Sequence, residues 1–190
     1  MKLIVGLGNP GRIYANNRHN VGFKCLNYFA RRQAIPFTKR QGRARIGQGE
    51  VGNHTVIVAK PQTYMNLSGL SVALLVKRFS INLDSLLVIH DDLDLAPGRF
   101  RISYGAGSAG HKGVSSIITH LKSQDFIRLR VGIGKPGITN GLSEVDTVTY
   151  VLGDFTPDEK KIMGQVMPRA SDAILCFLTE GLAAAMNKYN

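Results

Sequence analysis

Residues 2–11 read KLIVGLGNPG, a short apolar run that passes directly into a glycine-rich segment. A run of this kind is typical of a buried strand that ends in a loop. Gly6, Gly8 and Gly11 also match the G-x-G-x-x-G spacing of loops that bind a dinucleotide. A nicotinamide-dependent (NAD) oxidoreductase is therefore the first functional hypothesis to weigh.

Three features of the following residues disfavour dinucleotide binding. Pro10 removes a backbone N–H from the loop that would have to hold a pyrophosphate. An acid that binds the ribose is expected about 20 residues after the motif, but no Asp or Glu precedes Glu50. No helix pattern begins at the third glycine. We therefore predict a loop that presents Asn9 and His19 at the end of the first strand. A test of NAD binding would separate the oxidoreductase hypothesis from the others.

The rest of the chain alternates between strand and helix patterns. Strands are predicted at 44–51, 55–59, 86–89, 99–104 and 128–134, and helices at 21–32, 66–79, 111–121 and from 156 to 186. Residues 135–143 are predicted to form a mobile surface loop. In the second helix we expect an inward face made by Leu67, Leu70, Leu74 and Leu75. This order predicts one α/β domain over residues 1–190, with a twisted, mixed and largely parallel β-sheet flanked by helices.

Charge is distributed unevenly along the chain. The formal net charge is +11, and residues 1–140 carry 20 Lys and Arg against 6 Asp and Glu. A basic fold with an acidic end suggests a polyanionic partner such as nucleic acid. No apolar run approaches the roughly 18 residues that span a bilayer, so no membrane partner is expected. Cys25 and Cys176 both lie in apolar segments and are interpreted as buried free thiols of a cytoplasmic protein.

Polar residues gather where the predicted strands end, which is where α/β sheets place their sites. His19 is a candidate general base because an imidazole titrates near neutral pH, and Asp91 could orient it. The alternatives are a structural histidine and a turn or capping aspartate. Residues 91–94 could also hold magnesium, but Asp91 and Asp92 are expected to point to opposite sides of an extended chain. No G-x-S-x-G elbow is present, so the sequence does not suggest a covalent nucleophile.

Five further residues have a functional and a structural interpretation. Asn9 could bind substrate or tolerate a left-handed backbone, and Asn66 could bind substrate or cap a helix. Tyr14 and Tyr64 could stack on a nucleic-acid base or pack as core or rim aromatics. His111 stands at a glycine-flanked helix start, where backbone N–H groups could meet a phosphate, or it could cap that helix.

Taken together, these clusters resemble the bacterial peptidyl-tRNA hydrolase family nearly from end to end. Four groups of motifs carry the resemblance: GLGNPG at 6–11 with Tyr14 and RHNVG at 18–22, KP at 60–61 with TYMNLSG at 63–69, HDDLD at 90–94, and GH at 110–111 with RLRVGIG at 128–134. Each motif alone is weak, but four groups in this order are specific.

The resemblance implies hydrolysis of the ester that joins a peptide to the terminal ribose of tRNA, which recycles tRNA from peptides dropped during translation. By carry-over, His19 activates water, Asp91 supports it, and Asn9 and Asn66 bind around the peptide carbonyl. The partner would be peptidyl-tRNA, through its acceptor stem and peptide, and stalled large ribosomal subunits are a further candidate. The family implies a cytoplasmic monomer that requires neither metal nor organic cofactor.

The tRNA side of the implied site includes Tyr14, Tyr64, His111, Lys112 and Arg130. Two positions depart from the family pattern. Lys112 stands where the family usually has asparagine, and lysine donates hydrogen bonds but cannot accept them.

The second departure concerns the two basic residues with which the family grips the tRNA 5′-phosphate. One aligns with Arg130, but the other falls on Ser103. We predict that Arg101, which shares a strand face with Ser103, supplies the missing charge. A non-catalytic RNA-binding relative of the family remains the alternative, and loss of turnover would distinguish it.

Overall fold

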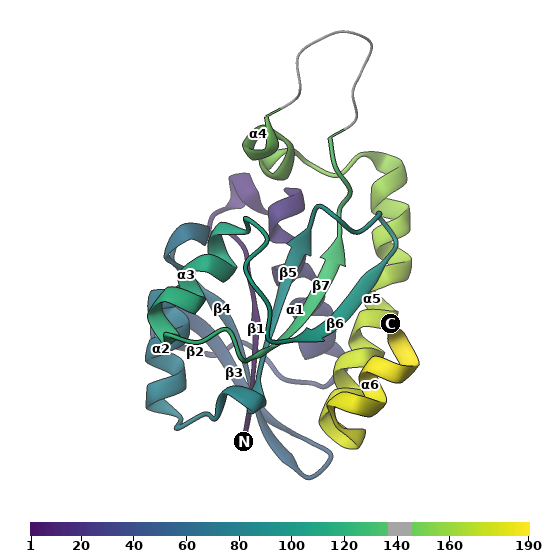
Figure 1. Cartoon of the computed structure of the whole chain (residues 1–190). Helices are drawn as coiled ribbons and strands as arrows, with labels where there is room; N and C mark the ends of the chain where they lie inside the picture. The colour runs from purple at the N-terminus through teal and green to yellow at the C-terminus, as the bar shows by residue number, and fades with distance from the viewer. Residues whose placement is uncertain (137–145) are drawn as a thin grey trace, which may run out of the picture.

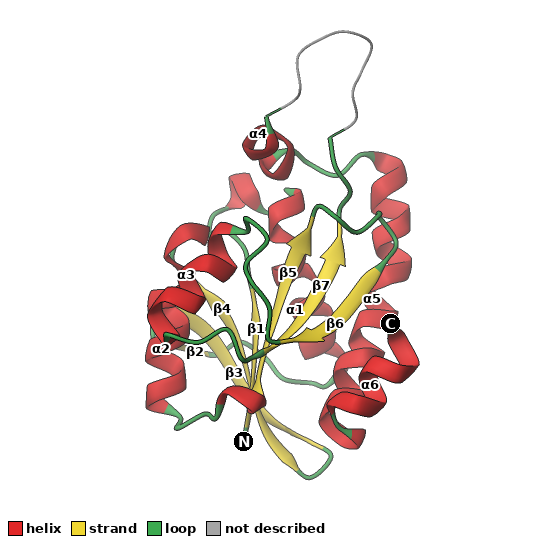
Figure 2. Ribbon diagram, in the orientation of Figure 1, coloured by secondary structure: helices red, strands yellow, loops and turns green. Residues whose placement is uncertain are grey.

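A seven-stranded sheet forms the centre of the molecule in the computed structural model, which describes residues 1–136 and 146–190 (Figures 1 and 2). The described strands are β1 (Lys2–Gly6), β2 (Lys39–Gln41), β3 (Ala44–Val51), β4 (His54–Pro61), β5 (Leu86–Asp92), β6 (Phe100–Tyr104) and β7 (Ile127–Gly132). The described α-helices are α1 (Val21–Arg32), α2 (Ser68–Arg78), α3 (Lys112–Leu121), α4 (Thr147–Leu152), α5 (Pro157–Glu180) and α6 (Leu182–Tyr189).

The sheet has the order β2-β3-β4-β1-β5-β7-β6. Its four central strands, β4, β1, β5 and β7, run parallel to one another. The outer strands β3 and β6 each pair antiparallel with an inner neighbour, and β2 pairs antiparallel with β3. The predicted mixed α/β sheet is thus confirmed, although only its central part is parallel.

Helices cover both faces of the sheet. One apolar cluster packs α1 and α5 against residues such as Ile4 and Leu87, and the other packs α2 and α3 against residues such as Leu3 and Val88. Every residue of β5 is buried, as the apolar run at 86–89 predicts for a strand covered on both sides. The first residues of α5 form the capping box that the sequence indicates, with Thr156 and Glu159 hydrogen-bonding each other's backbone N–H.

Several sequence predictions differ from the structure. The helix predicted from 156 to 186 is interrupted at Gly181, whose φ of 92° belongs to the left-handed region, and α6 follows it. Leu67 and Leu74 point outward, with 42% and 46% of their surface exposed. Leu75 is buried as predicted, and the rest of the buried face of α2 is made of smaller residues, namely Ser68, Gly69, Ser71 and Val72. Gly69 lets α2 approach α3 closely, because a Cβ there would lie 2.1 Å from the carbonyl oxygen of Ser116.

A second close approach brings the N-terminus of α1 onto the ends of β1 and β5. A Cβ on Gly22 would lie 2.4 Å from the carbonyl oxygen of Ile89, and one on Gly6 would lie 2.4 Å from that of Gly22. No helix starts at Gly11, since a 3₁₀ turn follows it and α1 begins only at Val21. The glycines therefore place the residues just before α1 at the carboxyl ends of the central strands.

Three smaller predictions concern a membrane span, the thiols and the loop at 135–143. Among the described helices, none is long and apolar enough to cross a membrane. Cys25 and Cys176 are both free and buried. Most of the predicted loop at 135–143 lies outside the described residues.

Candidate active site

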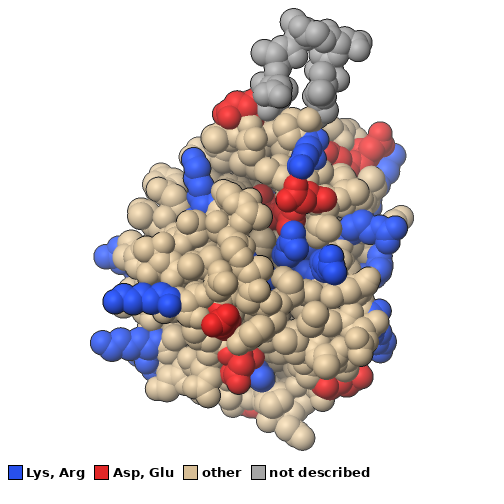
Figure 3. Space-filling view, viewed as in Figure 1, with Lys and Arg blue, Asp and Glu red and all other residues tan. Residues whose placement is uncertain are grey.

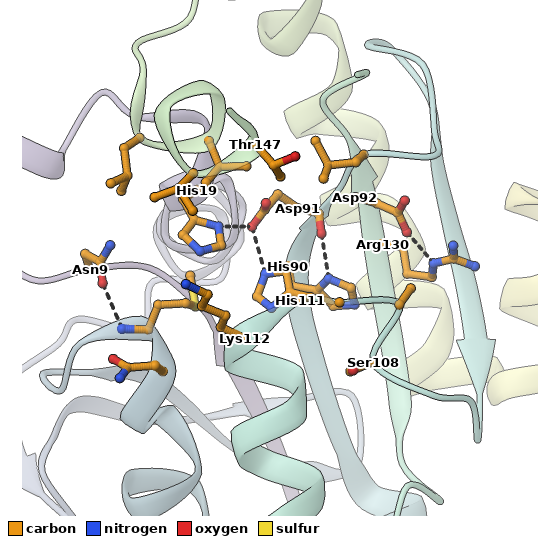
Figure 4. Close-up of a pocket in the computed structure, with 18 of the residues that line it drawn as sticks. Asn9, His19, His90, Asp91, Asp92, Ser108, His111, Lys112, Arg130 and Thr147 are labelled. Atoms are coloured by element: carbon orange, nitrogen blue, oxygen red, sulfur yellow. Dashed lines mark hydrogen bonds and ion pairs between the residues drawn. The ribbon is translucent and has the colours of Figure 1, made fainter. Parts of the chain in front are cut away.

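A cavity of about 590 Å³ opens at the carboxyl ends of β1 and β5, between the start of α3 and helix α4 (Figure 4). Residues from every predicted motif group line it. They include Asn9, His19, Tyr64, Asn66, Asp91, His111, Lys112 and Arg130. The sequence motifs, up to 121 positions apart, therefore meet at one place, as sites of α/β sheets do.

His19, Asp91 and His111 form a hydrogen-bonded trio at the base of the cavity (Figure 4). Nδ1 of His19 lies 2.8 Å from Oδ1 of Asp91, and Nε2 of His111 lies 2.9 Å from the same oxygen. His19 occupies a 3₁₀ turn, Arg18–Asn20, that leads directly into α1. Asp91 belongs to β5, so the turn or capping role considered for it is wrong.

The capping of α3 fixes the tautomer of His111. Its Nδ1 accepts hydrogen bonds from the backbone N–H groups of Gly113 and Val114, at 3.1 and 3.2 Å. The proton of the neutral ring must then be on Nε2, which donates it to Asp91. The alternative prediction of a capping histidine is confirmed. A phosphate site at this helix start is wrong, because the side chain of His111 occupies these two N–H groups.

The same reasoning orients His19. Asp91 is a carboxylate acceptor, so Nδ1 of His19 carries a proton and donates it. Nε2 has no hydrogen-bond partner among the described residues and remains available on the cavity side. Burial alone would raise the pKa of Asp91, but the adjacent imidazoles of His111 and His19 outweigh it and hold that pKa below its usual range. Asp91 is therefore ionised at neutral pH.

The three aspartates of residues 91–94 do not converge. Asp91 faces the two histidines, Asp92 contacts Nε of Arg130 at 2.6 Å, and Asp94 contacts Lys135 at 2.8 Å. The three carboxylates therefore do not form a shared magnesium site.

Among the described residues, His19, Asp91 and His111 place potential metal-ligand atoms within 4.8 Å of one another. Nδ1 of His19 and Nε2 of His111 each donate a proton to Asp91. A metal ion bound there would have to displace both protons and the hydrogen bonds that hold the trio.

Asn9 is fixed by three hydrogen bonds to Asn20 and Met65. Its backbone exchanges hydrogen bonds with the side chain of Asn20, each 2.9 Å long, and its Oδ1 accepts the N–H of Met65 at 2.8 Å. These partners leave the amide nitrogen Nδ2 as the free donor. Asn9 has no positive φ, so the left-handed alternative is wrong.

Asn66 and Tyr64 line the cavity, whereas Tyr14 lies beside Tyr64 and is not one of the residues that line it. Asn66 is exposed within a 3₁₀ turn, and the caps of the adjoining helices are Tyr64 and Leu67, so Asn66 is not a cap. Tyr64 is 58% exposed and stands edge-on to Tyr14, with ring centroids 6.4 Å apart. Both tyrosines are therefore rim aromatics rather than core residues.

Arginines line the neighbouring face of β6 and β7, where Figure 3 shows blue and red side chains together. Arg101 and Arg130 are register partners across these strands, so they lie on the same face of the sheet. Ser103 is instead the partner of Arg128. The guanidinium of Arg128 is turned inward and donates to the carbonyls of Ala106 and Gly107. Arg128 therefore supports the loop before α3 and is not available to a ligand.

The sequence did not single out His90 or α4. Val148, Val151 and Leu152 of α4 form an apolar side of the cavity. His90 is buried, its Nδ1 donates to the carbonyl of Asp91 at 2.7 Å, and its Nε2 has no partner among the described groups. Burial and the adjacent His111 lower the pKa of His90 to about 3.

Because His90 resists protonation only in the folded state, it makes the fold sensitive to acid. The unfolded chain binds the proton below the ordinary value of 6.5, so stability is lost as pH falls from there toward about 3. We expect wild type to lose about 2 kcal/mol more than His90→Asn between pH 7 and pH 5, at roughly 1.4 kcal/mol per unit of pKa difference. Urea unfolding at the two pH values measures this difference, and equal losses would contradict the assignment.

Comparison with known proteins agrees with this geometry. The sequence profile of a family described as peptidyl-tRNA hydrolase matches residues 3–190. The chain belongs to the peptidyl-tRNA hydrolase family. It is 47% identical over 190 residues to the peptidyl-tRNA hydrolase of Dehalococcoides mccartyi strain 195 and 42% identical to that of Syntrophomonas wolfei, and each alignment covers both chains completely.

The fold is also that of a peptidyl-tRNA hydrolase. The crystal structure of the Acinetobacter baumannii enzyme matches this chain with a TM-score of 0.91 and 36% sequence identity, covering 100% of this chain and 94% of that one. The membership inferred from the motifs is thus confirmed, together with the fold class. The roles of individual residues remain predictions.

Proposed function

We propose that this protein hydrolyses the ester between a peptide and the terminal ribose of tRNA, with His19 as the general base. The observation that carries the proposal is the arrangement of His19, whose Nδ1 is 2.8 Å from Asp91 while its Nε2 has no partner among the described residues and lies on the cavity side. A base held in this way can take a proton from water as the water attacks a carbonyl.

The reaction balances without a cofactor from outside the chain. Nε2 of His19 accepts the proton of water while the hydroxyl oxygen bonds to the ester carbon. The tetrahedral intermediate then expels the ribose oxygen, which takes the proton from the imidazolium. Asp91, already ionised, stabilises the cation that forms between these two steps.

Asn9 is proposed to stabilise the oxyanion. Its Oδ1 is occupied by the N–H of Met65, so the amide presents Nδ2 as a donor. A donor held in advance of the reaction needs no rearrangement when negative charge develops. Asn66, exposed at the mouth, is proposed to bind the peptide backbone.

The end of the tRNA is proposed to lie against Tyr14, Tyr64 and Lys112. The edge-on tyrosine pair offers an exposed aromatic surface for a base. Lys112 adds a positive charge at the mouth, where it would favour a phosphate of the tRNA end.

We also propose that the 190 residues form one domain that works as a monomer in the cytoplasm. Stalled large ribosomal subunits are proposed as a further partner.

The most direct functional test compares an N-acetylated aminoacyl-tRNA with its free-amine counterpart. We expect rapid hydrolysis of the N-acetylated ester and slow hydrolysis of the other, because the proposed contacts around the peptide bond need an N-blocked substrate. Binding of tRNA without hydrolysis would favour the non-catalytic RNA-binding alternative.

The phosphate grip gives a separate expectation. Arg101 is exposed, and Arg130 uses Nε for Asp92 while its terminal nitrogens remain for a ligand. Replacing either arginine with alanine should raise KM for full-length substrate severalfold and flatten its salt dependence, while kcat hardly changes.

A substrate without the 5′-phosphate controls for this grip. The effect of each alanine variant should shrink on it and vanish on a short acceptor-end mimic. Equal losses with and without the phosphate would mean that Arg101 binds another part of the RNA. Lys112 would then be the next residue to test.

A further inference from the structure

Arg18, which directly precedes His19, is a buried arginine outside the cavity. Only 9% of its side chain is exposed, and its Nη2 contacts Oε2 of Glu159 at 2.7 Å. An arginine is seldom buried without a specific set of partners. The partners of Arg18 therefore indicate which part of the molecule it holds in place.

Most of these partners belong to α4 and the residues just after it. Nη1 of Arg18 donates to the carbonyl of Tyr150 at 3.3 Å, and the guanidinium lies over the Tyr150 ring, 4.3 Å from its centroid. The backbone N–H of Arg18 donates to the carbonyl of Gly153 at 3.0 Å. The turn that carries His19 is thus joined to α4 through both side chain and main chain.

Helix α4 needs such an anchor. It has six residues, and a helix of this length is not stable on its own in water. Besides its bond to Arg18, α4 has one further hydrogen bond toward the sheet among the described residues. It runs from the Tyr150 hydroxyl to the carbonyl of Ile133, just after β7, at 2.7 Å. Yet Val148, Val151 and Leu152 of this helix form the apolar side of the cavity.

Gly153 gives independent support for the contact. A Cβ at this position would lie 3.0 Å from Nη1 of Arg18 and 3.3 Å from the carbonyl oxygen of Tyr150. The glycine has an ordinary φ of −76°, so its backbone conformation does not require glycine. Its small size instead leaves room for the guanidinium.

We propose that Arg18 is a positioning residue that holds α4 as a preformed apolar wall for the side chains of the bound peptide. The inference rests on the proposed function. An apolar wall already in place binds a side chain without a further ordering cost, whereas a loose α4 would have to be ordered by each substrate whose side chain packs against it. Arg18 therefore acts on substrate affinity, and the His19–Asp91 pair acts on the chemical step.

The test measures KM and kcat of Arg18→Lys on N-acetyl-leucyl-tRNA and N-acetyl-glycyl-tRNA, each relative to wild type. Lysine keeps the charge but cannot contact Glu159 and Tyr150 at once in the geometry of a guanidinium. We expect KM for the leucyl substrate to rise roughly 5- to 10-fold, since an apolar contact and an ordering cost are involved. KM for the glycyl substrate, kcat and the pH profile of kcat should stay close to wild type.

A second variant and a matched control complete the design. Gly153→Ala crowds the guanidinium without removing any charge and should reproduce the same selective rise in KM. Arg32→Lys alters an ion pair with Asp172 that is about 40% exposed and joins α1 to α5, so it should change neither constant. Amide hydrogen exchange at 147–153 should accelerate in the first two variants alone.

Two outcomes would overturn the inference. One is a lower Tm with KM unchanged on both substrates, which would give Arg18 a purely structural role. The other is unchanged exchange in α4 of either variant. Failure of the wild-type protein to hydrolyse either substrate would instead overturn the proposed function, while the exchange measurement would still report on the anchor.

Discussion

Replacing His19 with alanine is expected to lower kcat by roughly 10²- to 10⁴-fold, the range for the loss of a general base. The side chain supplies the only nitrogen of the trio that is free for water, because both nitrogens of His111 are engaged within the protein. The measurement is single-turnover hydrolysis of N-acetyl-aminoacyl-tRNA, with the affinity for the same tRNA determined in parallel.

The affinity and Tm of His19→Ala should remain close to those of wild type, since Asn20 and Asn9 hold the loop by their own hydrogen bonds. His120→Ala is a suitable control, because that histidine lies at the other end of α3 and, among the described residues, hydrogen-bonds only to the carbonyl of Ser116. Retention of most activity by His19→Ala would refute the assignment of the base.

Replacing Asp91 with asparagine is expected to lower kcat about 10- to 100-fold and to move the midpoint of its pH profile to lower pH. The amide oxygen of asparagine can still accept the N–H groups of His19 and His111, so the tautomers are retained. Only the negative charge that stabilises the imidazolium is lost. Without that charge the imidazolium is less stable, so proton transfer from water is less favourable.

The pH dependence of kcat for wild type and Asp91→Asn measures this effect. Asp92→Asn is the matched control, because its carboxylate contacts Arg130 rather than a histidine. It should leave the midpoint where it is. An unchanged midpoint in Asp91→Asn would show that the carboxylate has only a structural role.

Sequence patterns predicted the elements whose signals are local. Helix α1 and the hairpin strands follow from periodicity, and the start of α5 follows from Thr156, Pro157 and Glu159. Two elements were missed for physical reasons. Strand β2 has three polar residues, too few for a pattern, and α4 depends on tertiary contacts with Arg18 rather than on its own sequence.

Helix α2 shows where periodicity misleads. Of the four leucines predicted to face inward, Leu75 is buried, but close packing against α3 at Gly69 places Leu67 and Leu74 outward. The close contact between α2 and α3 requires small residues where the two helices meet. The hydrophobic pattern of α2 alone does not show where that contact lies.

Some residues of the candidate site could be predicted from the sequence, and others could not. His19 and Asp91 could be identified because each follows or ends a predicted strand, and such ends converge. The double role of His111 could not, because its Nδ1 caps a helix while its Nε2 binds a residue 20 positions away. The pairing of Arg18 with Glu159 spans 141 positions and leaves no local signal.

The most direct test of the central claim, that His19 is the base, is chemical rescue of His19→Ala by imidazole. The single-turnover rate on N-acetyl-aminoacyl-tRNA is measured against imidazole concentration, with Asp91→Asn in parallel. We predict that the rate of His19→Ala starts far below wild type and rises with the concentration of neutral imidazole, which enters the vacated space. The rate of Asp91→Asn should not rise. A His19→Ala rate close to wild type without imidazole would contradict the account.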